Sequence, residues 1–173
     1  MTTYRITALL LCGSLLALSA CAQPASTAVA TTPSVAKSNA VSPAAQPSLP
    51  LVHVHKSPTC GCCIVWIEHL KQAGFTVEVS DMDDVSPVKE RLGVPFGKGS
   101  CHTAEVAGYF VEGHVPAQDI KRLLAEKPDA KGLVVPGMPL GSPGMEVPDG
   151  RKDAYTVELV GRDGSSSAYA QYE

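Results

Sequence analysis

Three cysteines fall within four consecutive residues, Cys60-Gly61-Cys62-Cys63, where a predicted strand is followed by a predicted helix. The β-branched run at 51–55 predicts the strand, and apolar residues at helical spacing over 64–73 predict the helix. A Cys62–Cys63 disulfide would be strained, because adjacent Cα atoms are about 3.8 Å apart and disulfides favour about 5.5 Å. A structural scaffold would instead spread its disulfides to close long loops. The cluster therefore indicates thiol redox chemistry or soft-metal binding at the start of a helix.

The rest of the pattern predicts an α/β domain with the element order β-α-β-α-β-β-α, which is the order of the thioredoxin-like fold. A strand–helix–strand opening implies a parallel crossover. The later elements are expected as a strand at 75–79, a helix at 86–92, hairpin strands at 103–106 and 109–112, and a helix at 116–126. A Gly/Pro-rich C-terminal extension from Lys131 then leads to a final strand at 155–160.

The first twenty residues are typical of a secretory signal. Arg5 precedes an apolar run at 6–18, which is shorter than the about 20 residues that a membrane span needs. The tetrapeptide Leu18-Ser19-Ala20-Cys21 resembles the bacterial lipobox, in which the cysteine becomes the lipidated first residue. We therefore expect a lipoprotein signal peptide at 1–20 and two or more acyl chains on Cys21, which form a stable anchor. An ordinary signal peptide that contains a cysteine is the alternative.

Residues 21–50 predict a disordered tether behind the lipidated cysteine. Ala, Pro, Ser and Thr dominate this segment, and Lys37 is its only charge. Such a segment cannot bury enough apolar surface to offset its ordering entropy, and its prolines favour extended conformations. The folded domain is therefore expected at 51–173. The formal net charge of −3, without any basic run, argues against nucleic acid as a partner.

The thiol cluster favours copper among the soft metals. A helix start presents free N–H groups and the positive end of the dipole, so Cys60 is expected to be an acidic thiol. Three thiolates there repel one another unless a cation holds them, and thiolates select Cu(I), zinc or iron–sulfur units. Zinc sites usually use separated cysteine pairs, whereas adjacent Cys62 and Cys63 are placed to bridge several ions. We favour a polynuclear Cu(I)–thiolate cluster and keep a structural zinc site as an alternative.

Cys101 is the candidate for a fourth ligand. In thioredoxin-like folds, a cis-proline just before the hairpin touches the cysteine motif. No proline lies between Phe96 and Thr103, and Cys101 occupies this region instead. The fold would bring Cys101 against the cluster, with a free buried cysteine as the alternative.

Four motifs occur in order over about 51–147. They are Ser57-Pro58-Thr59-Cys60-Gly61-Cys62-Cys63, Ser100-Cys101-His102-Thr103-Ala104, Glu112-Gly113-His114-Val115-Pro116, and Pro136-Gly137-Met138-Pro139-Leu140-Gly141-Ser142-Pro143-Gly144-Met145. Together they resemble an uncharacterised-domain (DUF) metal-binding family that includes periplasmic copper-resistance proteins of the CopG type. The resemblance implies a thioredoxin-like fold in which Cys60, Cys62, Cys63 and Cys101 hold a thiolate-bridged four-copper cluster. It also implies copper resistance or homeostasis outside the cytoplasm, with Cu(I)/Cu(II) redox conversion as an open extension.

Four further side chains are candidates for auxiliary ligands or for support of the ligands. His102 adjoins Cys101, and His114 precedes the last predicted helix. Met138 and Met145 carry thioethers, which suit Cu(I), on a segment rich in Gly and Pro. The alternatives are a surface-loop histidine and methionines that fill gaps in the core.

The expected location is the periplasmic face of a bacterial envelope. Ala22 follows the lipidated cysteine, which favours the outer membrane by analogy with bacterial lipoprotein sorting. The expected partners are copper ions, the membrane through the lipid anchor, and a periplasmic copper carrier or exporter. A thiol–disulfide oxidoreductase that uses Cys60 and Cys63 is the alternative function, because the motif resembles the Cys-Gly-Pro-Cys of thioredoxin with Cys62 in place of proline.

Overall fold

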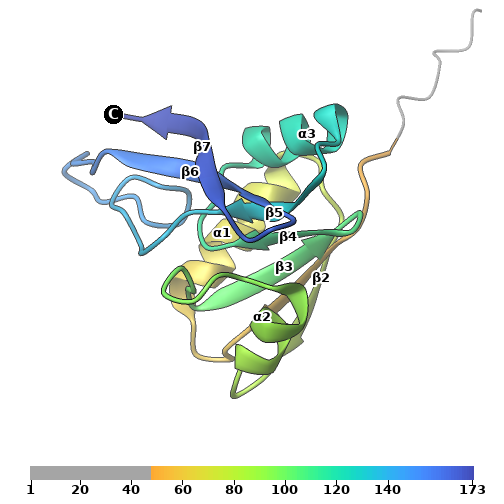
Figure 1. Ribbon diagram of the computed structural model, residues 1–173. Helices are drawn as coiled ribbons and strands as arrows, with labels where there is room; N and C mark the ends of the chain where they lie inside the picture. Colours follow the sequence, from red (N-terminus) through yellow and green to blue (C-terminus); the bar gives the residue numbers. More distant parts are fainter. Residues whose placement is uncertain (1–47) are drawn as a thin grey trace, which may run out of the picture. The chain divides into compact units, whose positions relative to one another are not determined.

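The computed structural model describes residues 48–173. The predicted signal peptide, Cys21 and most of the predicted tether lie outside the described residues. Within them, the elements are β1 (Val52–Lys56), α1 (Gly61–Gln72), β2 (Val77–Asp81), α2 (Ser86–Leu92), β3 (His102–Val106), β4 (Tyr109–Glu112), α3 (Ala117–Glu126), β5 (Ala130–Val134), β6 (Tyr155–Gly161) and β7 (Ser166–Tyr172). The strands form one mixed sheet in the order β2-β1-β3-β4-β5-β6-β7 (Figure 1).

The first half of the chain forms the predicted crossover and hairpin. β1 and β2 pair in parallel, so α1 connects two parallel neighbours as expected. β3 pairs antiparallel with β1 and with β4. The β3–β4 loop consists of Ala107 and Gly108, which both have positive φ angles, as a tight hairpin turn between twisted strands requires.

Helices cover the sheet unequally. α1 and α3 pack on one face, where Trp66, Leu70, Ile120 and Leu123 are fully buried in the main core. The other face has a smaller cluster of Phe110, Val134 and Val160, against which Leu92 at the end of α2 packs. Figure 1 accordingly shows α2 in front of the sheet and α1 behind it.

Besides the predicted final strand, which is β6, two further strands lie in the region that was expected to form an extension, namely β5 and β7. β5 was missed because Gly132 interrupts its apolar run. A Cβ at this position would lie 2.0 Å from the Phe110 carbonyl oxygen, so glycine permits the close approach of β4 and β5 here. β7 was missed because its mostly polar residues show no apolar alternation; it is an edge strand that pairs only with β6.

The other elements lie within a few residues of their predicted positions. α2 spans the predicted range. Pro87 lies in its first turn, and Gly93 is its C-cap in the left-handed conformation. α1 begins at Gly61, which makes Cys60 its N-cap.

The folded part of the chain starts slightly before the predicted boundary at residue 51, because Leu49 packs against the main core. Among residues 48–173, no helix combines the length and apolarity that a membrane crossing demands.

Candidate metal centre

Three cysteine sulfur atoms gather at the start of α1. Cys60 is the N-cap of this helix, and Cys62 lies in its first turn. Because Lys56 at the end of β1 is opposite His102 at the start of β3, the chain that enters β3 lies beside the chain that leaves β1. Cys101 therefore meets the cysteine motif, and the Sγ atoms of Cys60, Cys62 and Cys101 all lie within 4.8 Å of one another.

The fourth predicted ligand, Cys63, is linked to Cys60 by a disulfide with a Cα–Cα distance of 5.4 Å. Its side chain is fully buried, whereas Cys60, Cys62 and Cys101 are partly exposed. Cys62 and Cys101 are free thiols. In this form only two of the four sulfur atoms can become thiolates, so binding of metal by all four requires reduction of the disulfide.

The environment of the Cys62 thiol disfavours its ionisation. Burial raises the pKa of the Cys62 thiol, and the adjacent Cys101 raises it further, while backbone N–H groups of Cys62 and Cys63 lower it in part. A cation bound between the sulfur atoms would lower the pKa of the Cys62 thiol, because its positive charge favours the thiolate. The predicted acidity of Cys60 concerns the reduced form and stays a prediction.

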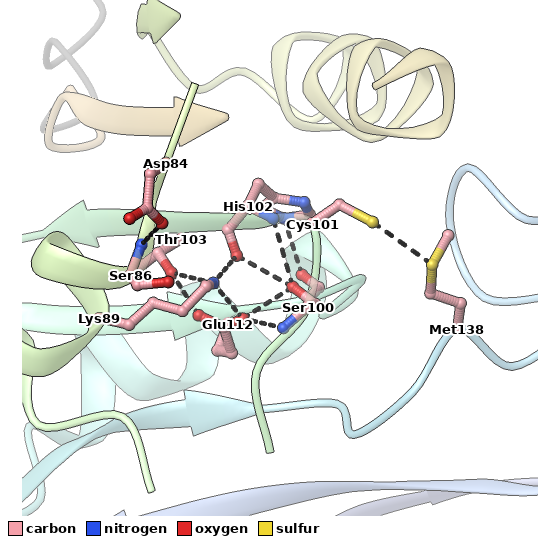
Figure 2. A network of polar contacts seen from close by, with 10 residues as sticks. Asp84, Ser86, Lys89, Ser100, Cys101, His102, Thr103, Glu112 and Met138 are labelled. Carbon is pink, nitrogen blue, oxygen red and sulfur yellow. Dashed lines mark hydrogen bonds and ion pairs between the residues drawn. The ribbon is translucent and has the colours of Figure 1, made fainter. Parts of the chain in front are cut away.

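A methionine extends the set of sulfur atoms. Met138 lies in the loop between β5 and β6, and its Sδ is 3.6 Å from Cys101 Sγ. Figure 2 shows the Cys101 side chain directed toward Met138 and away from the polar residues behind it. Met145 is partly buried in the same loop and exchanges backbone hydrogen bonds with Gly141 and Ser142. The structure therefore places Met138 in contact with a cysteine sulfur.

A buried polar network holds the segment that leads into β3 (Figure 2). The fully buried Glu112 carboxylate accepts hydrogen bonds from Lys89 Nζ at 2.6 Å, from Ser100 Oγ at 2.8 Å, from the Ser100 backbone N–H and from the Thr103 hydroxyl. Lys89 Nζ also donates to the His102 carbonyl at 2.9 Å and to Thr103 Oγ1 at 2.6 Å. All three ammonium hydrogens are thereby used. The network anchors the residues on both sides of Cys101.

The sequence analysis did not identify this network. Lys89 lies in α2 and Glu112 at the end of β4, 23 residues apart in the chain. Their pairing depends on the sheet order and has no short-range signature. The one available signal was the presence of Glu112 in a recognised motif.

His102 and His114 are both fully buried beside the cysteine motif. The His102 ring lies 4.3 Å from the Trp66 ring and 5.5 Å from the His114 ring, measured between centroids. Burial, together with the nearby His114 and Lys89, lowers the pKa of His102 to about 3, and burial also lowers the pKa of His114. The alternative of a surface-loop position for His114 is therefore wrong.

Gly144 allows the β5–β6 loop to pack on the start of α1. A Cβ at this position would lie 2.8 Å from the Cys62 carbonyl oxygen, 3.0 Å from the Trp66 backbone nitrogen and 3.3 Å from His114 Nδ1. Its backbone φ of +90° is also one that residues with a side chain rarely adopt. The loop, the first turn of α1 and His114 therefore form one packed unit.

Comparisons with known proteins give a consistent result. A family model described as a protein of unknown function, DUF411, matches residues 98–145. The chain is similar to a solved structure titled copper resistance protein copG, form 1, with 52% identity and a TM-score of 0.68 over 72% of this chain and 98% of that chain. For form 2 of the same protein, the identity is 51% and the TM-score 0.69, over 72% of this chain and 99% of that chain. A search of curated proteins found no match.

Proposed function

The chain belongs to the DUF411 copper-resistance family, and from this premise we propose that it binds copper through its clustered cysteine thiolates. The observation that carries the proposal is the convergence of the Cys60, Cys62 and Cys101 sulfur atoms within 4.8 Å of one another. The two solved structures that resemble the chain are titled copper resistance protein. The proposed role is copper resistance or homeostasis.

The proposed centre is a polynuclear copper–thiolate cluster. Reduction of the Cys60–Cys63 disulfide would supply the remaining two thiolates, so that Cys60, Cys62, Cys63 and Cys101 all become ligands. Adjacent cysteines favour bridging of several ions, and thiolates and thioethers are soft donors that suit Cu(I). The Met138 thioether, which contacts Cys101, would be an auxiliary ligand. Met145 remains a candidate from the same loop, and Cu(I)/Cu(II) conversion remains a proposed extension.

We interpret the domain as thioredoxin-like. The parallel β1–α1–β2 unit, the β3–β4 hairpin and the following α3 support this interpretation. The cysteine motif occupies the junction between β1 and α1. The sheet is extended beyond that arrangement by β6 and β7.

Metal content tests the proposed function. The full chain would be purified anaerobically from its own envelope, analysed for metals and examined by copper X-ray absorption. The proposal expects several copper ions per chain with sulfur as the dominant neighbour. About one zinc per chain would instead support the structural zinc site, and copper without sulfur neighbours would contradict the cluster.

A second candidate function is thiol–disulfide exchange, which the Cys60–Cys63 disulfide favours. A thiolate of a reduced pair would attack a substrate disulfide, and the second thiol would then release the reduced substrate and close the Cys60–Cys63 bond. Insulin reduction by metal-free protein, unchanged in Cys62→Ser, would support this function over copper binding.

The proposed location is the periplasmic face of the envelope, with the domain tethered by a lipid on Cys21, in the outer membrane. A periplasmic copper carrier or exporter is the proposed protein partner. We expect Cys21→Ala to move the protein from the membrane fraction to the soluble fraction, because the apolar run at 6–18 is too short to span a bilayer. Cell fractionation and lipid labelling measure this, with Cys12→Ala as a matched control that should stay anchored. Retention of Cys21→Ala in membranes, with no lipid on the unchanged protein, would contradict the lipoprotein assignment.

A further inference from the structure

Three buried histidines each carry a ring nitrogen without a hydrogen-bond partner, namely His55 Nδ1, His102 Nδ1 and His114 Nε2. The rings of His102 and His114 are neighbours and neither residue has exposed surface, whereas His55 is 7% exposed and its other ring nitrogen pairs with Glu105. Buried polar atoms in native proteins are nearly always paired, and an exception commonly marks the place of an ion or a water molecule. Two such atoms on neighbouring rings therefore indicate a ligand.

Backbone carbonyls determine which nitrogen of each ring carries the proton. His102 Nε2 lies 3.0 Å from the Gly113 carbonyl oxygen, and His114 Nδ1 lies 2.7 Å from the Pro143 carbonyl oxygen. Because a carbonyl can only accept a hydrogen bond, the bonded nitrogen is the donor in each neutral ring. The lone pair is left on the unpartnered nitrogen. Histidines that bind metals show this arrangement, in which the second ring nitrogen donates to a carbonyl or carboxylate.

The spacing of the two rings suits a shared ion. A metal ion lies about 2 Å from an imidazole nitrogen and hence about 3 Å from the ring centroid. Two rings on one ion can therefore have centroids up to about 6 Å apart, and the observed distance is 5.5 Å. Trp66 holds this geometry, because its ring packs against the tilted His102 ring and its Nε1–H donates to the Val115 carbonyl beside His114.

We propose that His102 Nδ1 and His114 Nε2 together bind one copper ion on the inner side of the cysteine cluster. The cysteine sulfur atoms that converge are partly exposed, whereas both histidines are fully buried. His102 directly follows Cys101, and Gly144 packs between the Cys62 carbonyl and the His114 ring. Neutral imidazole is a good copper ligand. This inference rests on the proposed function, because the thiolates would be the entry point for the copper.

The first test observes the nitrogen atoms directly. The full chain, labelled with nitrogen-15 in its five histidines, would be reduced, kept anaerobic and titrated with Cu(I), which is diamagnetic. We expect the unprotonated nitrogen signals of His102 and His114 to move upfield together, while those of His53 on β1 stay in place. Sulfur-bound copper with both signals unmoved would overturn the inference and leave the proposed function intact. Absence of copper from the sulfur atoms would instead overturn the proposed function.

The second test removes the unpartnered nitrogen and keeps the N–H donor. His102→Gln and His114→Asn each retain an N–H at the position that donates to the carbonyl. Each variant should bind one copper fewer per chain and lose the imidazole contribution to the copper X-ray absorption spectrum. The melting temperature of metal-free protein should fall only by the lost packing of the ring, such as that of His102 against Trp66. The copper-loaded protein should lose more, because it also loses a metal ligand. His53→Gln is the control with unchanged copper.

Two results would contradict the inference. If both variants retain the copper content and the absorption spectrum of the unchanged protein, the nitrogens are not ligands. If the same melting-temperature loss occurs in metal-free and copper-loaded protein, the rings have a structural role only, for example around a trapped water molecule.

Discussion

Cys62→Ser is expected to remove more than one copper ion from each chain. In a bridged cluster each sulfur atom is shared between ions, so the loss of one thiolate unseats several of them. Cys101→Ser should have the same effect from a distant part of the chain, because its Sγ belongs to the same sulfur group. Copper per chain would be measured after Cu(I) loading of reduced protein against a competing chelator.

The four single variants at positions 60, 62, 63 and 101 should behave alike. The matched control is Cys12→Ser, a cysteine that precedes the predicted signal cleavage point and should leave the copper content unchanged. In a thioredoxin-type enzyme Cys62 would occupy the replaceable middle position, and its loss would leave Cys60–Cys63 chemistry intact. Unchanged copper in Cys62→Ser or Cys101→Ser would therefore exclude the cluster.

Glu112→Ala is expected to destabilise the folded domain by about 3–5 kcal/mol, which is the usual cost of removing one partner from a buried ion pair. The substitution leaves the Lys89 ammonium, whose side chain is only 15% exposed, without its carboxylate. It also removes the hydrogen-bond acceptor of Ser100 and Thr103 on either side of Cys101. Denaturant unfolding measures the loss of stability, and chelator competition should show weaker copper binding.

Glu68→Ala is the matched control for this prediction. Glu68 pairs with Lys71 on the exposed surface of α1, where both side chains are about half exposed, and such pairs contribute about 0–1 kcal/mol. The double variant Lys89→Met with Glu112→Leu should recover part of the lost stability, because it leaves no unpaired buried charge. Equal effects of Glu112→Ala and Glu68→Ala would show that the network has no role in stability.

The elements best predicted from sequence have local start and stop signals. α2 lies at its predicted position because Pro87 favours its first turn and Gly93 supplies its left-handed end. β5 and β7 lack such signals. The first contains a glycine whose role is visible only against Phe110 of the neighbouring strand, and the second is a polar edge strand. Their formation depends on partners that are distant in sequence.

The same distinction applies to the site. The position of the cysteine motif at a helix start follows from the local pattern, and Cys101 was predicted to join it from the order of the elements. The structure brings Cys101 to Cys60 and Cys62 and places Met138 against it. The Lys89–Glu112 pair could not be predicted, because its residues come from elements that become neighbours only in the folded sheet. The burial of His114 depends likewise on the packing of the β5–β6 loop.

The separation of Cys101 from the other cysteines has a consequence for folding in the presence of copper. Three of the proposed sulfur ligands lie within four consecutive residues, so an unfolded chain would still be able to chelate copper through them. Cys101 joins only when β3 pairs with β1. A ligand stabilises a fold only by the difference between its affinities for the folded and unfolded chains. Copper should therefore stabilise the domain by less than its total binding free energy, and a chain that unfolds would keep part of its copper bound.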